Sequence, residues 1–135
     1  ATDVVNASRE NVPEAVRALT GGAMVDLCVE AVGFPESLAT AVMLPRRFGR
    51  VYVFGVARYE TQEFPLNHFM RNEMEMISSV GADCVEFFES AVRMVAGGLD
   101  LSGLITHTLP WAEAPRAFEM YAKHTDGALK IVLKV

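Results

Sequence analysis

The sequence predicts an α/β protein in which a parallel sheet is flanked by helices. Three observations support this fold class. Short strand-like runs alternate with segments whose apolar residues recur at helical spacing, and glycine or proline stands at the transitions. The strand-like runs are also apolar enough to be covered on both faces, as parallel strands are. The 135 residues suffice for one domain with a hydrophobic core.

The first part of the chain is predicted to alternate strands with helices. Helical spacing is clear at 10–19, which ends at Gly21-Gly22, and at 84–96, which ends at Gly97-Gly98. A third helix is expected at 36–47, where Pro35 suits the first turn and Gly49 follows the end. A short helix at 66–71 and four strands complete the series, the strands at 3–6, 25–31, 50–56 and 74–80.

The pattern changes near residue 104. A strand is expected at 104–109, a helix at 113–123 and a final strand at 128–135. A weak seam at 99–103 separates this strand-helix-strand segment from the rest.

Charge and hydropathy exclude several classes of partner. With 12 basic and 17 acidic side chains the formal charge is −5, and no basic cluster occurs beyond Arg46-Arg47. The sequence therefore lacks the electrostatic footprint for nucleic acid or an anionic membrane surface. No apolar run approaches the roughly 18 residues of a membrane span, and no signal peptide is recognisable. We expect a cytoplasmic protein.

The sequence offers no catalytic or metal-binding motif. His68, His107 and His124 are far apart, and Cys28 and Cys84 lack the spacing of a metal or redox motif. Neither a nucleophile elbow nor a phosphate-binding glycine loop is present. We therefore predict no catalytic residue and no metal ligand.

Three predicted strands end in small or apolar residues. These ends are Ala31, Val32 and Gly33; Phe54, Gly55 and Val56; and Ser78, Ser79 and Val80. In an open parallel sheet the ligand crevice lies beyond the carboxyl ends of the strands, so the three ends would share one site. Ordinary turn chemistry explains such glycines equally well. Glu30, at the end of the strand at 25–31, is expected to bond either backbone donors or a ribose hydroxyl.

Several longer runs occur in a recognisable order, at 25–36, 48–56, 96–100, 104–107, 117–119 and 127–133. Their order and spacing resemble the later half of the nucleotide-binding domain in medium-chain dehydrogenase/reductases, the zinc alcohol dehydrogenase superfamily. The opening residues 1–6 are similar to the third strand of that domain. The resemblance covers essentially the whole chain.

The resemblance implies a partial Rossmann-type, doubly wound parallel sheet in residues 1–103. Residues 104–135 would be a C-terminal segment that rejoins a catalytic domain. In the strand order 3-2-1-4-5-6 the chain would supply strands 3 to 6. The family's glycine fingerprint and zinc ligands lie upstream of such a region. We therefore expect a C-terminal fragment that, by itself, neither holds zinc nor oxidises alcohols.

The resemblance also implies NAD or NADP as the cofactor. The first strand end would lie against the ribose, the second beside the nicotinamide and the third near its carboxamide. The family more often has Gly-Ser at the third end, so Ser78 departs from the pattern. Lys130 matches a position that can reach the pyrophosphate, or is a solvated lysine. The candidate cofactor-binding residues are Ala31, Val32, Gly33, Phe54, Gly55, Val56, Ser78, Ser79 and Lys130.

The implied parent is an NAD(P)-dependent, zinc-dependent alcohol, polyol or amino-alcohol dehydrogenase. It would act on a small alcohol and form a homo-oligomer, through the unpaired edge of the strand at 25–31 or the surface at 74–80. Two alternatives stay open: a zinc-free quinone or enoyl reductase of the same superfamily, and a non-catalytic nucleotide-binding or oligomerisation module. His107 is interpreted as a structural residue.

Overall fold

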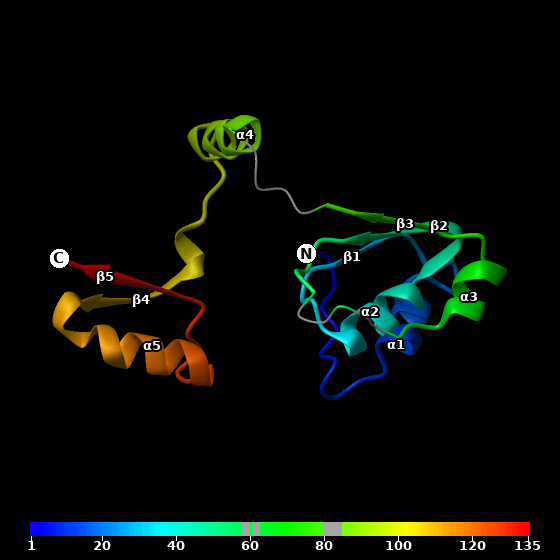
Figure 1. Cartoon of the computed structure of the whole chain (residues 1–135), viewed down its shortest axis with the longest axis horizontal. Coiled ribbons are helices and arrows are strands. Elements are labelled where there is room, and N and C mark those ends of the chain that lie inside the picture. The colour runs from blue at the N-terminus through cyan, green and yellow to red at the C-terminus, as the bar shows by residue number, and fades with distance from the viewer. Residues whose placement is uncertain (58–59, 61–62, 80–84) are drawn as a thin grey trace. The chain divides into compact units, whose positions relative to one another are not determined.

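The computed structural model describes residues 1–57, 60, 63–79 and 85–135. The chain divides into two compact units, Ala1–Ala82 and Asp83–Val135 (Figure 1). The functional division that we predict between residues 103 and 104 stays a prediction.

Unit 1 contains a three-stranded parallel sheet in the order β1-β2-β3. The strands are β1 (Val25–Glu30), β2 (Pro45–Val53) and β3 (Glu75–Ser78). The helices α1 (Val12–Leu19), α2 (Pro35–Val42) and α3 (Leu66–Arg71) lie on the same side of this sheet (Figure 1).

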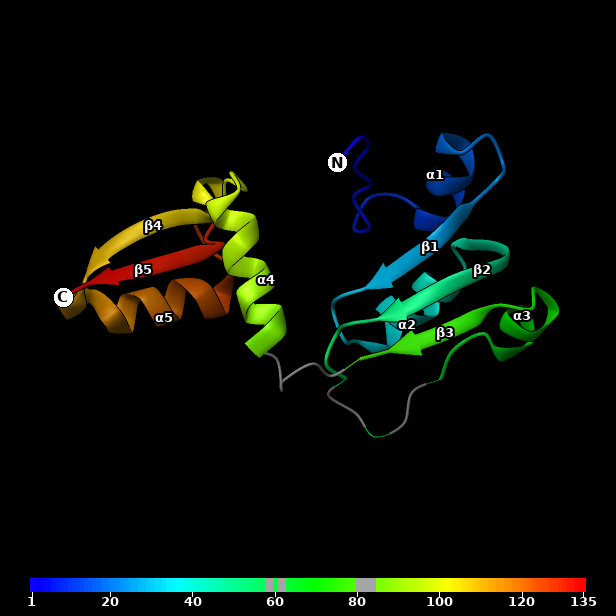
Figure 2. The ribbon, with the colours of Figure 1, turned by 90° about the horizontal axis from the view of Figure 1, so that it is seen from above.

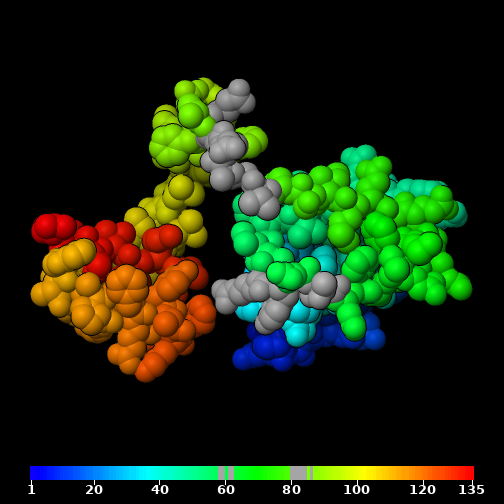
Figure 3. Space-filling view, in the orientation of Figure 1, coloured from blue at the N-terminus to red at the C-terminus, as the bar shows by residue number. Residues whose placement is uncertain are grey.

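The core of unit 1 lies between α2 and the sheet. Ala41 and Val42 on α2 pack with Val51 at the centre of β2, and all three are buried. Half-buried side chains surround them, among them Cys28, Val53 and Met76 from the strands, Phe64 from the segment that leads into α3, and Phe69 from α3. The space-filling view shows the atoms of unit 1 as one continuous body (Figure 3).

Helix α1 confirms the prediction made for 10–19. The side chain of Asn11 accepts a hydrogen bond from the Glu14 N–H at 3.1 Å, and Pro13 occupies the first turn. The Asn11 side chain gives the Glu14 N–H a partner that the helix itself cannot supply, and the proline ring fixes a helical φ in the first turn. Gly21 and Gly22 both have positive φ, so the two glycines end the helix as expected.

Helix α2 is shorter than predicted, because it ends at Val42 and β2 already begins at Pro45. Proline lacks an N–H and disfavours helix in the residue before it. The apolar spacing that suggested a helix up to Arg47 therefore continues into a strand. Gly49, interpreted as the residue after the helix, lies inside β2, where a Cβ would stand 2.7 Å from the Pro45 Cβ.

The strand predicted at 3–6 is wrong. Val4 is 87% exposed, and the chain turns immediately afterwards. The Asn6 side chain accepts a hydrogen bond from the Ser8 N–H at 3.0 Å, and the Asn6 carbonyl accepts one from the Arg9 N–H at 2.9 Å. The turn takes up the backbone N–H and carbonyl of Asn6, and no strand in the described part of the chain pairs with 3–6. Among the described residues, β1 pairs only with β2.

Unit 2 confirms the predicted strand at 104–109, helix at 113–123 and strand at 128–135, with bounds that differ by at most two residues. The helix predicted at 84–96 is confirmed from Val85 onward, and Cys84 lies outside the described residues. Helix α4 (Val85–Ala96) precedes β4 (Ile105–Pro110), α5 (Ala114–Lys123) and β5 (Lys130–Lys134). Strands β4 and β5 pair in parallel, and α5 lies along one face of the pair (Figure 2). Short 3-10 turns, η1 (Ser102–Leu104) and η2 (Trp111–Glu113), flank β4. None of the described helices has the length and apolar character to cross a membrane.

Candidate functional site

The three strand ends of unit 1 meet at one edge of the sheet. The register pairs Glu30 of β1 with Val53 of β2, and Val53 with Ser78 of β3. Since all three strands are parallel, the segments 31–33 and 54–56 and the residues Ser78 and Ser79 follow at the same edge. Val80, the last residue of the predicted third end, lies outside the described residues.

The first two strand ends are joined through their backbones. The Glu30 carbonyl accepts hydrogen bonds from the N–H groups of Phe54 at 2.8 Å and Gly55 at 2.9 Å. A Cβ on Gly55 would stand 2.4 Å from the Gly33 nitrogen, and one on Gly33 would stand 2.3 Å from the Val56 oxygen. Gly33 also has φ +85°, which disfavours any side chain. The glycines therefore serve a close approach of two loops, which goes beyond ordinary turn chemistry.

Glu30 binds, through its carboxylate, the backbone of the first loop, residues 31–33. Its side chain is only 4% exposed, and Oε1 accepts hydrogen bonds from the N–H groups of Val32 and Gly33, both at 2.8 Å. The Ser37 hydroxyl, in the first turn of α2, donates to the same oxygen at 2.6 Å. Of the two roles that the sequence left open, the structure shows the bonds to backbone donors.

The environment of Glu30 favours its charged form. Burial by itself would raise the pKa of the carboxyl, but the hydrogen bonds from Ser37, Gly33 and Val32 outweigh it and lower the pKa below its ordinary value. The negative charge also acts on Cys28, two residues earlier on the same face of β1. Burial, and then the charge of Glu30, raise the pKa of the Cys28 thiol.

The loop side chains beyond the edge are exposed and apolar. Val32 and Phe54 are each 61% exposed and Val56 is 74% exposed. At the third end, the Tyr52 hydroxyl lies 2.5 Å from the Ser79 Oγ. Sequence reasoning missed Tyr52 and Ser37. Tyr52 precedes the candidate Phe54 by two residues, and residues two apart in a strand share a face, which was the available signal.

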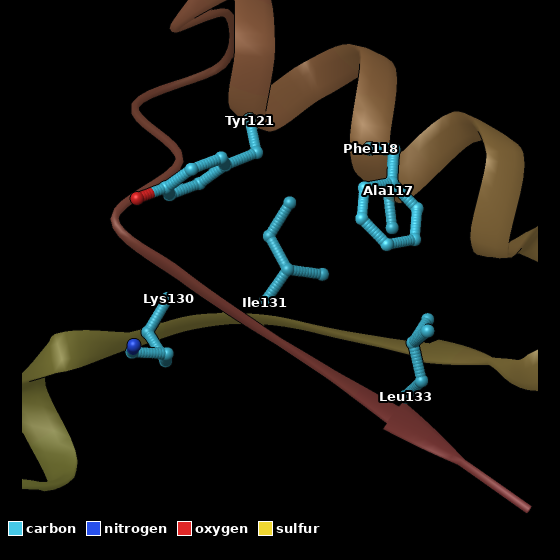
Figure 4. A pocket seen from close by; sticks show the side chains of 6 residues that line it. All are labelled: Ala117, Phe118, Tyr121, Lys130, Ile131 and Leu133. Carbon is cyan, nitrogen blue, oxygen red and sulfur yellow. The ribbon is translucent and has the colours of Figure 1, made fainter.

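Lys130 belongs to unit 2, and its predicted role toward a cofactor stays a prediction. It begins β5 and lines an apolar hollow of about 220 Å³ (Figure 4). Tyr121 lies near Lys130 at one end of the hollow, and Phe118 and Leu133 lie toward the other (Figure 4). The Thr106 hydroxyl accepts a hydrogen bond from the Leu129 N–H at 3.0 Å and so fixes the start of β5.

His107 is held by polar neighbours on unit 2. Its Nε2 lies 3.3 Å from the Asp126 Oδ2, and its Nδ1 lies 3.0 Å from the Thr106 Oγ1. These contacts join β4 to the turn that precedes β5. Within the described ranges, no group of three or more His, Cys, Asp or Glu side chains is arranged to hold a metal ion. We therefore assign none of the described residues to zinc.

Parallel strands whose carboxyl ends lie at one edge, with helices between the strands, are typical of the α/β fold class to which dinucleotide-binding domains belong. The model of the zinc-binding dehydrogenase family matches residues 1–97. The chain belongs to this family.

Individual relatives are dehydrogenases. The chain is 27% identical to L-arabinitol 4-dehydrogenase of Hypocrea jecorina, over 96% of this chain and 34% of the relative. It is 25% identical to L-threonine 3-dehydrogenase of Bacillus velezensis, over 98% of this chain and 38% of the relative. The structure of the alcohol dehydrogenase TADH from Thermus sp. ATN1 has 31% identity and a TM-score of 0.85, over 97% of this chain and 37% of that one. The chain thus spans little more than a third of the length of these relatives.

Proposed function

We propose that this chain supplies the nicotinamide side of an NAD(P) site in an alcohol dehydrogenase-type oxidoreductase. The observation that carries the proposal is the junction of the first two strand ends, where Gly33 and Gly55 bring the two loops within van der Waals distance. Ligand crevices of this fold class lie beyond these strand ends. Membership of the zinc-binding dehydrogenase family supports the same kind of chemistry.

The residues at the edge fit a flat, mostly apolar ring. Val32, Phe54 and Val56 present exposed apolar side chains, and Gly33 and Gly55 let the two loops that carry these side chains approach each other closely. The nicotinamide, when bound, accepts or donates a hydride. The loops would orient the ring and exclude water from one of its sides, and the hydroxyls of Ser78 and Ser79 would bond its carboxamide. Ala31 would contact the ribose, and Lys130 the pyrophosphate.

The names of two relatives suggest the class of substrate. Their names specify a polyol, L-arabinitol, and a hydroxyl-bearing amino acid, L-threonine. We propose a small hydroxyl-bearing substrate of this kind for the whole protein. A zinc ion that polarises the reacting oxygen would be held by residues other than those described in this chain.

Self-association is a further part of the proposal. Among the described residues, β1 and β3 each pair with β2 alone, so each has an unpaired edge. Such edges recruit other strands. We propose that the chain forms a homo-oligomer through one of them. Size-exclusion chromatography with light scattering should give a mass above one chain, and a stable monomer at high concentration would contradict this.

Half-cofactors test the binding proposal. Nicotinamide mononucleotide carries the proposed ligand half, and AMP carries the other half. We expect millimolar nicotinamide mononucleotide to shift the NMR amide signals of 31–33, 54–56 and 78–79 in the isotope-labelled chain. AMP should leave these signals in place. The proposal is wrong if nicotinamide mononucleotide leaves them unmoved, or if AMP alone moves them.

A further inference from the structure

Glu30 is the only charged side chain among the described residues that is buried. Burying a carboxylate is unfavourable unless polar partners replace its water. Three donors converge here on the one oxygen Oε1: two backbone N–H groups and the Ser37 hydroxyl. No cation lies among these partners, so two backbone N–H groups and one hydroxyl stabilise the charge.

The same residue also holds the neighbouring loop. Its main-chain carbonyl accepts the N–H groups of Phe54 and Gly55, while its carboxylate holds the loop that follows β1. The two loops are close enough at this point that a Cβ on Gly55 would stand 2.5 Å from the Glu30 Oε2. One residue therefore fixes the spacing of both loops and ties them to the first turn of α2.

We propose that Glu30 is a positioning residue for the nicotinamide side of the cofactor, an inference that rests on the function proposed above. It does not touch the cofactor. Its carboxylate accepts three hydrogen bonds, all on Oε1. A glutamine could present its carbonyl oxygen to the same donors, but hydrogen bonds to a neutral oxygen are weaker than those to a charged carboxylate. Loss of the carboxylate should release the segment 31–33 while the bonds to the Glu30 carbonyl persist.

The test compares Glu30→Gln with Val42→Ala in the full 135-residue chain. Val42 is fully buried on α2 and lies outside the edge, so its truncation destabilises unit 1 without removing a loop contact. Nicotinamide mononucleotide affinity is measured by NMR titration, at a temperature where both variants are fully folded. Amide hydrogen exchange of Val32, Gly33, Phe54 and Gly55 is measured on the same samples.

We expect Glu30→Gln to weaken binding about tenfold and to speed exchange at Val32 and Gly33 more than at Phe54 and Gly55. Val42→Ala should bind as the wild type does. Ser37→Ala, which removes one donor and keeps the carboxylate, should fall between the wild type and Glu30→Gln.

The outcomes separate this inference from the proposed function. If the wild type does not bind nicotinamide mononucleotide at the edge, the proposed function fails. If the wild type binds and Glu30→Gln binds equally well, the positioning role is wrong and the proposed function stands. If Val42→Ala loses as much affinity as Glu30→Gln, the effect is general destabilisation and the positioning role is again wrong.

Discussion

The two units of this chain differ in how they support their candidate residues. In unit 1, the edge formed by the strand ends rests on a core whose Val42 and Val51 are fully buried, and on a buried charge with three hydrogen-bond donors. In unit 2, the buried apolar residues among those described are Ala117, Met120 and Ala128, and none of the three is as completely buried as Val42 or Val51. Helix α4 exposes apolar side chains, with Phe87 67% and Phe88 72% exposed. The strand-end edge of unit 1 therefore has the more firmly packed support.

The largest effect is expected from Gly33→Ala in unit 1. The substitution places a side chain at φ +85° and a Cβ 2.3 Å from the Val56 oxygen. Backbone strain and overpacking together should cost about 3 kcal/mol of unfolding free energy. Urea denaturation followed by a probe in unit 1 measures this. Gly127→Ala in unit 2 is the matched control, because it has φ +64° without any neighbour within 4 Å, and it should cost clearly less. Equal losses would contradict the close approach of the loops.

Val51→Ala should lower the stability of unit 1 by about 2 kcal/mol, because it leaves a cavity at the centre of the core. Amide exchange in β1 and β2 reports the loss. Phe118→Ala is the comparison in unit 2, where the side chain is 73% exposed and its truncation should change exchange in β4 and β5 little. The contrast between the units would be wrong if Phe118→Ala had the larger effect.

Acid should weaken unit 1 through Glu30. The folded pKa lies below the ordinary value of 4.5, so the stabilisation is complete above pH 4.5 and is lost as the pH falls through the lowered pKa. At neutral pH, Glu30→Gln should cost about 1 to 2 kcal/mol, the cost of weakened hydrogen bonds to a charged group. The difference between the wild type and the variant in urea denaturation should shrink as the pH falls. A difference that stayed constant down to the acid limit would contradict the charged state of Glu30.

The smallest effect is expected from Glu119→Gln in unit 2. Glu119 pairs with Lys123 one helical turn later at 2.5 Å, but both side chains are more than half exposed. Water and salt screen such pairs, so the variant should change the unfolding free energy by less than about 0.5 kcal/mol. Thermal unfolding followed by circular dichroism is sufficient to check this. A loss above about 1 kcal/mol would show that surface charge holds α5 more firmly than exposure suggests.

Much of the fold was predictable because helices and buried strands carry local periodicity. The spacing in 10–19 and the glycines after it located α1, and the parallel alternation placed three strand ends at one edge. The errors arose where local signals competed. Pro45 ended a helix whose apolar spacing continued, and the hydrogen bonds of Asn6 formed a turn directly after the valines that suggested a strand.

The candidate site was predictable in position but only partly in detail. The glycines at 33 and 55 were visible in the sequence, whereas their mutual approach depends on the register of β1 and β2. The choice of Glu30 between backbone donors and a ligand, and the contact between Tyr52 and Ser79, depend on three-dimensional distances. No spacing rule in the sequence contains those distances.

The most direct test of the central claim is a through-space NMR measurement on the chain with bound nicotinamide mononucleotide. Nuclear Overhauser effects between the ring protons and the protein identify the residues that contact the ring. We predict effects to Val32, Gly55 and Val56 at the strand-end edge of unit 1. Effects confined to Phe118 and Tyr121 at the hollow of unit 2 would contradict the claim.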